Sequence, residues 1–177
     1  MTVIPYSQCS ACPRECRLPP DGDQAGYCQT GTASYIASIC RHRGEEPPVS
    51  GKNGICNIFF AHCNLQCIFC QNYQISDNRT DPDRYLMELP EIVEKIKGIL
   101  EDGARGIGLV SPSHLPDAVK NLIAEFKRRR WNEALVYNTS AYDRVETIES
   151  LKEDISLYLP DLKYRDPELA ERYSRAS

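Results

Sequence analysis

The sequence predicts an α/β fold, in which a loop-rich segment rich in cysteine precedes a partial (βα) barrel of parallel strands. From about residue 55 onwards, short apolar runs alternate with longer stretches of helical periodicity, which is the pattern of parallel strands joined by helices. A chain of 177 residues that is 41% hydrophobic and 26% charged is sufficient for one domain with a core of its own.

A change of composition divides the chain into two regions. Residues 1–50 are rich in cysteine, proline and glycine and show no sustained helical or strand period. We read them as a loop-rich N-terminal segment that builds little core and needs a metal for its order. Residues 51–177 are expected to form the N-terminal part of the barrel.

Four short apolar runs are expected to be buried strands, because each one is bounded by turn residues or by a helical period. They cover residues 55–60, 107–110, 134–137 and 155–159.

Helices are expected between and after these strands. The first begins at Pro90, a residue favoured in the first turn of a helix, and ends before Gly103. The second follows Pro116, the third includes residues 145–151, and a further helix begins at Glu168. The inward-facing positions of the first two helices are Ile92, Val93, Ile96, Ile99 and Leu100, and Ala118, Val119, Leu122, Ile123 and Phe126.

The order β-α-β-α-β-α-β implies parallel strands joined by right-handed crossovers. In such folds the functional groups gather at the carboxyl ends of the strands. We therefore expect one site, formed by residues 63–70, 111–114, 138–140 and 161–163, which follow the four strands. Four parallel strands leave an edge exposed, so we expect a truncated barrel.

Charge and hydropathy exclude some classes of partner and location. A net charge of -4 gives no reason to expect nucleic acid or an anionic membrane as partner. The N-terminus lacks the pattern of a signal peptide, and no apolar run is long enough for a spanning helix. We therefore expect a cytoplasmic chain, whose thiols are kept reduced.

The nine cysteines all precede residue 71. An odd number of thiols in a reducing compartment does not indicate a disulfide framework, and their segregation indicates metal binding. Cys63, Cys67 and Cys70 lie on a short segment that leaves a predicted strand. Thiolates select zinc, copper(I) or iron–sulfur clusters, and a structural zinc ion needs four ligands. Three thiolates fit a cubane cluster with one iron left open.

The sequence CNLQCIFC at residues 63–70 resembles the signature of the radical S-adenosylmethionine (radical SAM) enzymes. This resemblance implies a [4Fe-4S] cluster on Cys63, Cys67 and Cys70, with S-adenosylmethionine bound at the open iron. It also implies an incomplete radical SAM barrel and an oxidoreductase that cleaves this cofactor to a 5′-deoxyadenosyl radical for hydrogen-atom abstraction. An electron donor such as flavodoxin or ferredoxin is implied as a partner.

Further motifs resemble one subgroup, the proteins related to the pyruvate formate-lyase activating enzyme, most of which have no assigned substrate. The subgroup resemblance implies a protein partner whose backbone glycine loses a hydrogen atom. Members of this subgroup are usually much longer, which also indicates a fragment. The motifs are CPREC at 12–16, GYC at 26–28, EEPP at 45–48, IFF at 58–60, CQNY at 70–73, SPSH at 111–114 and LPDLKY at 159–164.

Four residues are candidates for binding S-adenosylmethionine. Many radical SAM enzymes have Gly-Gly-Glu after the second strand, whereas this chain has SPSH, so the hydroxyl of Ser111 is the candidate there. Asn138 follows the third strand and either meets the cofactor or caps the next turn. Asp161 and Lys163 face the same way on an extended segment; they resemble the Asp-x-Lys element of the activating enzymes, and the alternative is a surface ion pair.

His62 stands where family members commonly have glycine. An imidazole at this position either caps the open iron, which would block the cofactor, or turns into the core. We expect the core position.

The N-terminal cysteines Cys9, Cys12, Cys16 and Cys28 form the pattern C-x2-C-x3-C-x11-C. Four thiols at this spacing suit a zinc ion or an auxiliary iron–sulfur cluster, and the other alternative is free thiols. Cys40 and Cys56 have no evident partner, so we expect each to be a buried free thiol.

Two classes of function remain open from the sequence. One is a radical SAM enzyme of unknown substrate. The other is a non-catalytic module that binds an iron–sulfur cluster or zinc, or an inactive fragment of such an enzyme.

Overall fold

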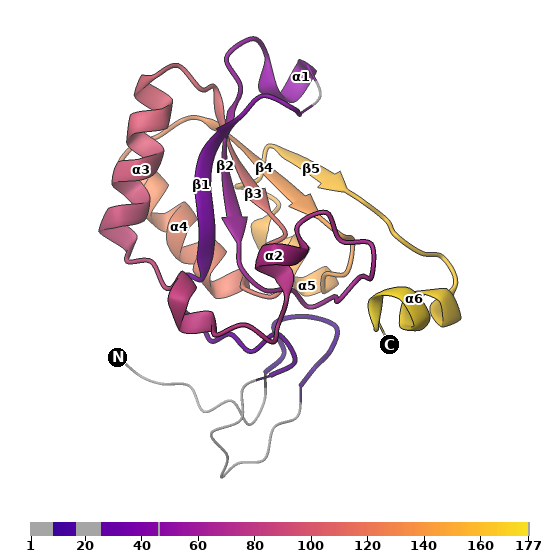
Figure 1. Ribbon diagram of the computed structural model, residues 1–177. Coiled ribbons are helices and arrows are strands. Elements are labelled where there is room, and N and C mark those ends of the chain that lie inside the picture. Colours follow the sequence, from indigo (N-terminus) through magenta and orange to yellow (C-terminus); the bar gives the residue numbers. More distant parts are fainter. Residues whose placement is uncertain (1–8, 17–25, 46, 177) are drawn as a thin grey trace.

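A five-stranded, mostly parallel sheet organises the structure, a computed structural model that describes residues 9–16, 26–45 and 47–176 (Figure 1). The strand order follows the sequence, and only β1 is antiparallel to its neighbour. The strands are β1 (Ile36–His42), β2 (Ile55–Phe60), β3 (Gly106–Val110), β4 (Ala134–Thr139) and β5 (Leu157–Pro160).

The four predicted parallel strands are confirmed. β2 pairs with β3, β3 with β4 and β4 with β5, each in parallel register. β4 continues two residues beyond the predicted end, through Asn138 and Thr139. β5 begins at Leu157, later than predicted, because Ile155 still donates its backbone N–H to Leu151 at the end of the preceding helix.

The expectation of loops throughout residues 1–50 is wrong at β1. This strand pairs antiparallel with β2, from Ile36 opposite Phe60 to His42 opposite Ile55. Only Ile36 is buried, and most of the other residues of β1 are half-buried. A strand without one fully buried face needs no regular alternation of apolar and polar residues, and the sequence of β1 shows no clear one. Pairing with β2 stabilises β1 and covers the edge of β2 that the four-strand prediction left open.

The predicted helices are also confirmed, and α3 and α4 lie against one face of the sheet (Figure 1). Pro90 and Pro116 occupy the first turns of α3 and α4, and Gly103 follows α3 with a φ of 97°. No helix of the described residues is long and apolar enough to cross a membrane. The helices are α1 (Pro47–Ser50), α2 (Tyr73–Ser76), α3 (Leu89–Glu101), α4 (Pro116–Arg128), α5 (Val145–Leu151) and α6 (Pro167–Ser174), with a 3-10 turn η2 (Pro82–Tyr85).

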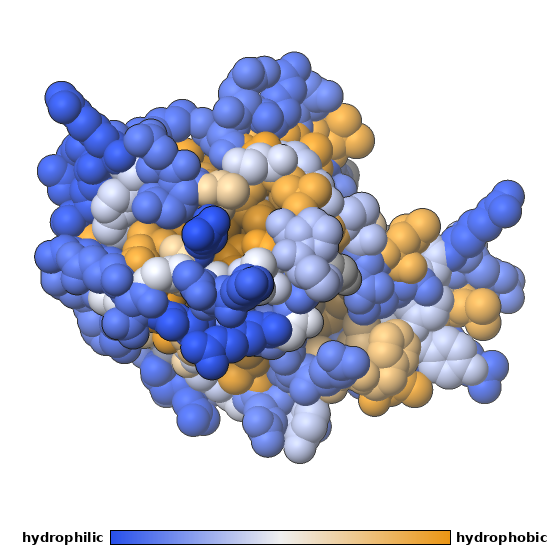
Figure 2. Space-filling view, turned by 90° about the horizontal axis from the view of Figure 1, so that it is seen from above, coloured by the Kyte–Doolittle hydropathy of each residue, from blue (hydrophilic) through white to orange (hydrophobic). Residues whose placement is uncertain are grey.

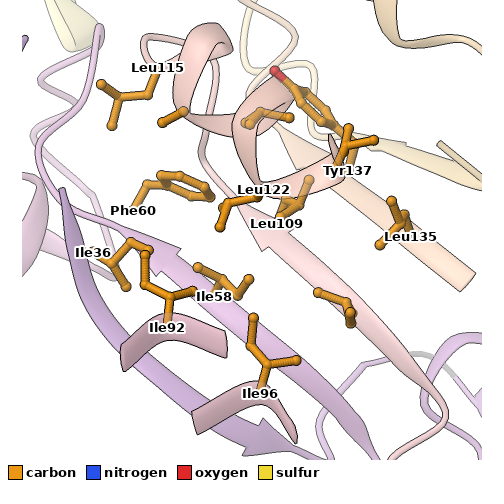
Figure 3. Close-up of a cluster of buried hydrophobic side chains, with 14 of the residues drawn as sticks. Ile36, Ile58, Phe60, Ile92, Ile96, Leu109, Leu115, Leu122, Leu135 and Tyr137 are labelled. Atoms are coloured by element: carbon orange, nitrogen blue, oxygen red, sulfur yellow. The ribbon is translucent and has the colours of Figure 1, made fainter. Parts of the chain in front are cut away.

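The main hydrophobic core lies between the sheet and the helices (Figure 3). Alternate strand residues such as Ile58, Phe60 and Leu109 meet Ile92 of α3 and Leu122 of α4 there, and all five are almost fully buried. Each side chain of this size contributes about 1.5–3 kcal/mol when it leaves water. The core thereby fixes which face of every parallel strand points away from the helices.

The opposite face of the sheet carries polar groups and a glycine near its middle. Asn57 is buried there and donates its amide to Glu45 Oε1 at 3.0 Å. Gly108, its partner across the sheet, leaves the space that the Asn57 side chain occupies. Hydrophobic surface, framed by hydrophilic residues, is visible from the end at which the parallel strands begin (Figure 2). Within the described residues β5 is the far edge, so the sheet is open and not a closed barrel.

Substitution of Gly108 tests this close packing. In Gly108→Ala the new Cβ overlaps Asn57 Oδ1, and Asn57 cannot move without losing its bond to Glu45. We expect a loss of about 1–3 kcal/mol of unfolding free energy in denaturant titrations. Gly98→Ala, in α3 with open space around it, is the control and is expected to be neutral or stabilising by up to about 1 kcal/mol. Equal effects of both substitutions would contradict this account.

Candidate functional site

The segments that follow the parallel strands meet at one edge of the sheet, as predicted. The backbone N–H of Ser111, after β3, donates to Asn138 of β4 at 2.9 Å. The N–H of Asp161, after β5, donates to Thr139 of β4 at 2.8 Å. These bonds extend the sheet pairing into the loops, so the backbone itself fixes the positions of the candidate residues.

Sharp turns begin these loops. His62, Ser111 and Ala141 have φ values of 63°, 56° and 58°, in the left-handed region that residues other than glycine seldom adopt. Such a conformation persists only where the surroundings hold it, and it is concentrated at functional sites. The chain therefore turns immediately at or after the strand ends, close to the sheet edge.

The His62 side chain turns into the core, as expected. It is fully buried. Its Nδ1 donates to the carbonyl of Cys28 at 2.7 Å, and its Nε2 lies 3.0 Å from Thr80 Oγ1. Both ring nitrogens are thus engaged, and the imidazole is not a ligand for a metal on the neighbouring cysteines.

The loop of residues 61–72 presents Cys63, Cys67 and Cys70, all free thiols that remain partly accessible. Cys63 Sγ accepts the backbone N–H of Leu65 at 3.3 Å. Cys67 Sγ accepts the hydroxyl of Ser174 at 2.8 Å, and Cys70 Sγ lies 3.3 Å from Ser76 Oγ. Donors directed at sulfur stabilise the thiolate form, which is the form that binds iron.

The three thiols influence one another electrostatically. Burial, with smaller contributions from the charges of Cys67 and Cys70, raises the pKa of Cys63 to about 12. A bound cationic centre removes this cost, because it deprotonates a coordinating thiol. This donor set, accessible and rich in sulfur, fits an iron–sulfur cluster.

A single metal ion fits these residues less well. Among the side chains of residues 9–16, 26–45 and 47–176, no three of the His, Cys, Asp and Glu type converge on one ion. The zinc alternative for the N-terminal cysteines therefore finds no support. A cubane binds its ligands at separate corners, so its sulfurs need not converge on one point.

Lys163 lies near the cysteine loop. Its ammonium pairs with the carboxylate of Asp161, which is the more exposed partner, and its positive charge lowers the pKa of Cys67 against the larger effect of burial. The structure therefore contains the surface ion pair that was the alternative to cofactor binding by Asp161 and Lys163. The charge of Lys163 is close enough to Cys67 to act on its thiol.

Ser111 and Asn138 lie side by side at the ends of β3 and β4. Neither side chain makes a hydrogen bond within the described part of the chain. The turn after β4 is capped instead by Thr139, whose Oγ1 accepts the N–H of Ala141 at 3.0 Å. The alternative of a capping role for Asn138 is therefore not observed, and both side chains remain available to a ligand.

A polar network behind these residues was not predicted. Ser113 Oγ lies 3.0 Å from Thr139 Oγ1, which in turn donates to Asp143. The hydroxyl of Tyr137 donates to the other oxygen of Asp143 at 2.9 Å. His114 donates from Nε2 to the carbonyl of Ala61 at 2.9 Å. The short spacing from Thr139 to Asp143 was the available signal, but the burial of Thr139 and its contact with Ser113 could not be read from the sequence.

Arg14 of the CPREC motif links the N-terminal segment to the cysteine loop. Its guanidinium lies 3.4 Å from the centre of the Tyr27 ring, a cation–π contact. It donates to the carbonyls of Asn64 and Arg175. Asn78 adds a second link, because its amide donates to the carbonyls of Tyr27 at 2.9 Å and Cys63 at 2.8 Å.

The other cysteines divide by burial. Cys56 is fully buried within β2, as expected. Cys40 is only partly buried in β1, because it lies on a half-exposed strand. The four N-terminal thiols, Cys9, Cys12, Cys16 and Cys28, all fall within the described residues and are free.

Comparison with known proteins identifies the family to which this chain belongs. The family model described as the radical SAM superfamily matches residues 57–177, more than half of the chain. This chain belongs to the radical SAM superfamily. The match includes the last four residues of β2, all of β3 to β5, the cysteine loop and all four candidate cofactor-binding residues.

A relative of this radical SAM chain is "Uncharacterized protein MJ0674" from Methanocaldococcus jannaschii. The two are 27% identical over 173 residues, which cover 96% of this chain and 49% of that protein. The chain thus spans about half the length of the curated relative that it matches.

Cys56 predicts a pH dependence of the metal-free chain. Burial raises its pKa from 9.0 to about 12, so above pH 9 the unfolded chain loses this proton while the folded chain retains it. The free energy of unfolding is therefore expected to fall by about 2–4 kcal/mol from this group between about pH 9 and pH 12. Denaturant titrations under reducing conditions measure it. Cys56→Ala should show a shallower decline, and an identical decline would contradict the assignment.

Substitution of Asn78 tests how much its hydrogen bonds between the N-terminal segment and the cysteine loop contribute to stability. Asn78→Ala removes the donor to the Tyr27 and Cys63 carbonyls and the acceptor for the Cys63 N–H. We expect a loss of about 1–3 kcal/mol in the unfolding free energy of the metal-free chain, because buried partners lose their bonds. Asn53→Ala, at an exposed turn before β2, is the control and should change little. A stability of Asn78→Ala equal to that of the control would be inconsistent with these contacts.

Proposed function

We propose that this chain binds a [4Fe-4S] cluster through Cys63, Cys67 and Cys70 and cleaves S-adenosylmethionine reductively. The observation that carries the proposal is the thiol triplet on the loop after β2, within a chain of the radical SAM superfamily. When bound and reduced, such a cluster would supply one electron to break the sulfonium C–S bond, which would give methionine and a 5′-deoxyadenosyl radical for hydrogen-atom abstraction.

The chain's own residues have separate roles in this proposal. Leu65 N–H and the Ser174 hydroxyl direct hydrogen bonds at the sulfurs of Cys63 and Cys67, which favours their thiolate forms. The His62 imidazole is engaged elsewhere, so it leaves the open iron to the cofactor.

The cofactor-binding residues are proposed from their position. Ser111 and Asn138 meet at the strand ends and offer a hydroxyl and an amide to the amino, carboxylate or ribose groups of S-adenosylmethionine. Lys163, whose charge reaches Cys67, offers a cation to the carboxylate, and Asp161 holds Lys163 in place.

The partners follow from the chemistry. The cluster needs a one-electron donor, and a flavodoxin or a ferredoxin fits. We further propose that the substrate is a protein whose glycine loses a hydrogen atom, on the resemblance of the motifs to the subgroup of the pyruvate formate-lyase activating enzyme. Because the chain spans about half of its relative, this substrate and its contacts belong to the proposal for the whole protein.

A second candidate is an iron–sulfur module that binds the cluster but does not turn over the cofactor. The observation in its favour is that the chain matches only 49% of the length of its relative. Titration of S-adenosylmethionine against the electron paramagnetic resonance spectrum of the reduced cluster separates the two. Binding at the open iron perturbs the spectrum, so an intact cluster whose spectrum stays unchanged supports the module, and a changed spectrum counts against it.

The enzyme proposal predicts product formation that depends on the triplet. The purified chain is reconstituted with iron and sulfide without oxygen, reduced and mixed with S-adenosylmethionine, and 5′-deoxyadenosine is measured by chromatography. We expect product from the wild type and none above background from Cys67→Ala, because one corner of the cluster loses its ligand.

Cys40→Ala is the matched control. It removes a thiol of β1 that is outside both cysteine groups, so product formation should remain. An intact cluster in the wild type without any 5′-deoxyadenosine would refute the enzyme proposal for this chain.

A further inference from the structure

We propose that Cys9, Cys12, Cys16 and Cys28 hold a second iron–sulfur cluster, separate from the one on the triplet, which fixes the N-terminal segment against the cysteine loop. This inference goes beyond the proposed function and does not depend on it.

Two segments bring these thiols together. The backbone N–H of Tyr27 donates to Cys16 Sγ at 3.4 Å. Gly26 lies so close that a Cβ at its position would be 3.5 Å from the same sulfur. The residues before and after positions 17–25, which are outside the described residues, therefore meet at Cys16.

The remaining three thiols lie on the two segments that meet at Cys16. Cys9 and Cys28 line one cavity of about 320 Å³, and Cys28 Sγ lies 3.0 Å from Thr30 Oγ1. Cys12 is buried within the turn that Glu15 N–H closes onto its carbonyl at 3.1 Å. Cys9 and Cys28 thus share one cavity, and Cys16 lies beside the residues that directly precede Cys28.

Their charges act on one another. Burial, with smaller contributions from the charges of Cys28 and Cys16, raises the pKa of Cys12 to about 11. Burial also raises the pKa of Cys28, with added contributions from Cys9 and Cys16. Each of the four thiols is within electrostatic range of at least one other.

The geometry favours a cluster over a zinc ion. A tetrahedral zinc site needs four ligands about 2.0–2.3 Å from one ion, and no three candidate ligands of the described residues converge in this way. The triplet of the radical SAM loop has the same property: its thiols are coupled in charge but do not converge on one point. The two groups of cysteines share one arrangement, and it suits ligands at separate corners of a cubane.

The location gives the second cluster a structural role. The described residues between positions 9 and 34 contain no helix or strand. Their attachments are polar: Arg14 on Tyr27 and Asn64, and His62 on the carbonyl of Cys28. A segment with so little core gains its folding free energy from the metal that it binds.

The test counts metal in variants of the whole chain. Each protein is purified and reconstituted without oxygen, and iron, sulfide and zinc per chain are measured. The variant Cys63→Ala/Cys67→Ala/Cys70→Ala removes the ligands of the first cluster, and we expect it to retain about half of the wild-type iron and sulfide. The variant Cys12→Ala/Cys16→Ala should also lose about half, and Cys40→Ala should lose none.

Three outcomes decide the matter. Retained iron and sulfide in the triplet variant support the proposal. A folded triplet variant, as judged by circular dichroism, that contains no metal overturns it. A stoichiometric zinc ion in place of iron overturns the assignment of a cluster.

A second measurement serves if the triplet variant does not fold. The Mössbauer spectrum of the wild type should contain two cluster populations in equal amounts, and cofactor binding should change only the one with an open iron. A single population overturns the proposal. If two populations are present and S-adenosylmethionine changes neither, the second cluster stands and the proposed cofactor binding fails.

Discussion

Parallel pairing of β2, β3, β4 and β5 is the constraint on which the candidate site depends. It brings the carboxyl ends of four strands to one edge, and the backbone bonds from Ser111 to Asn138 and from Asp161 to Thr139 extend that order into the loops. The relative placement of the cysteine loop and the candidate cofactor ligands is therefore set by the backbone. Side chains then need only the correct chemistry at positions that the sheet has already arranged.

A second layer of contacts holds the cysteine loop from outside its own strand. Backbone bonds join it to the end of α6, where Gln66 and Ile68 donate to the carbonyls of Ser174 and Tyr173. Asn78 and Arg14 join it to the N-terminal segment. Residues from both ends of the described chain thus meet at this loop. Because many of these contacts are hydrogen bonds to backbone atoms, they specify position more than they contribute apolar burial.

Much of the fold was predictable because its signals are local. Apolar runs and prolines at helix starts marked β2 to β5, α3 and α4, and the cysteine spacing marked the triplet. β1 was missed because most of its residues are half-buried, so that its stability depends on pairing with β2, a partner that local periodicity does not reveal.

The site was predictable in its ligands but not in its supports. Cys63, Cys67 and Cys70 carry a pattern that is legible in the sequence. The bonds of Ser113 to Thr139 and of Arg14 to Asn64 join residues 26 and 50 positions apart, and such contacts exist only after the fold has formed. The same limit applies to His62, whose buried position was expected but whose bond to Cys28 was not.

The backbone at His62 has a consequence for the choice of residue there. Its φ of 63° is a conformation that glycine adopts without steric cost, and glycine is the residue that radical SAM proteins commonly carry at this position. Glycine and histidine are thus two residues that can occupy this position with its positive φ. Glycine does so by lacking a Cβ, whereas the imidazole compensates by tying the strand end to the carbonyl of Cys28. In this chain the N-terminal segment and the cysteine loop are accordingly coupled through the side chain of a residue at a position where glycine is common.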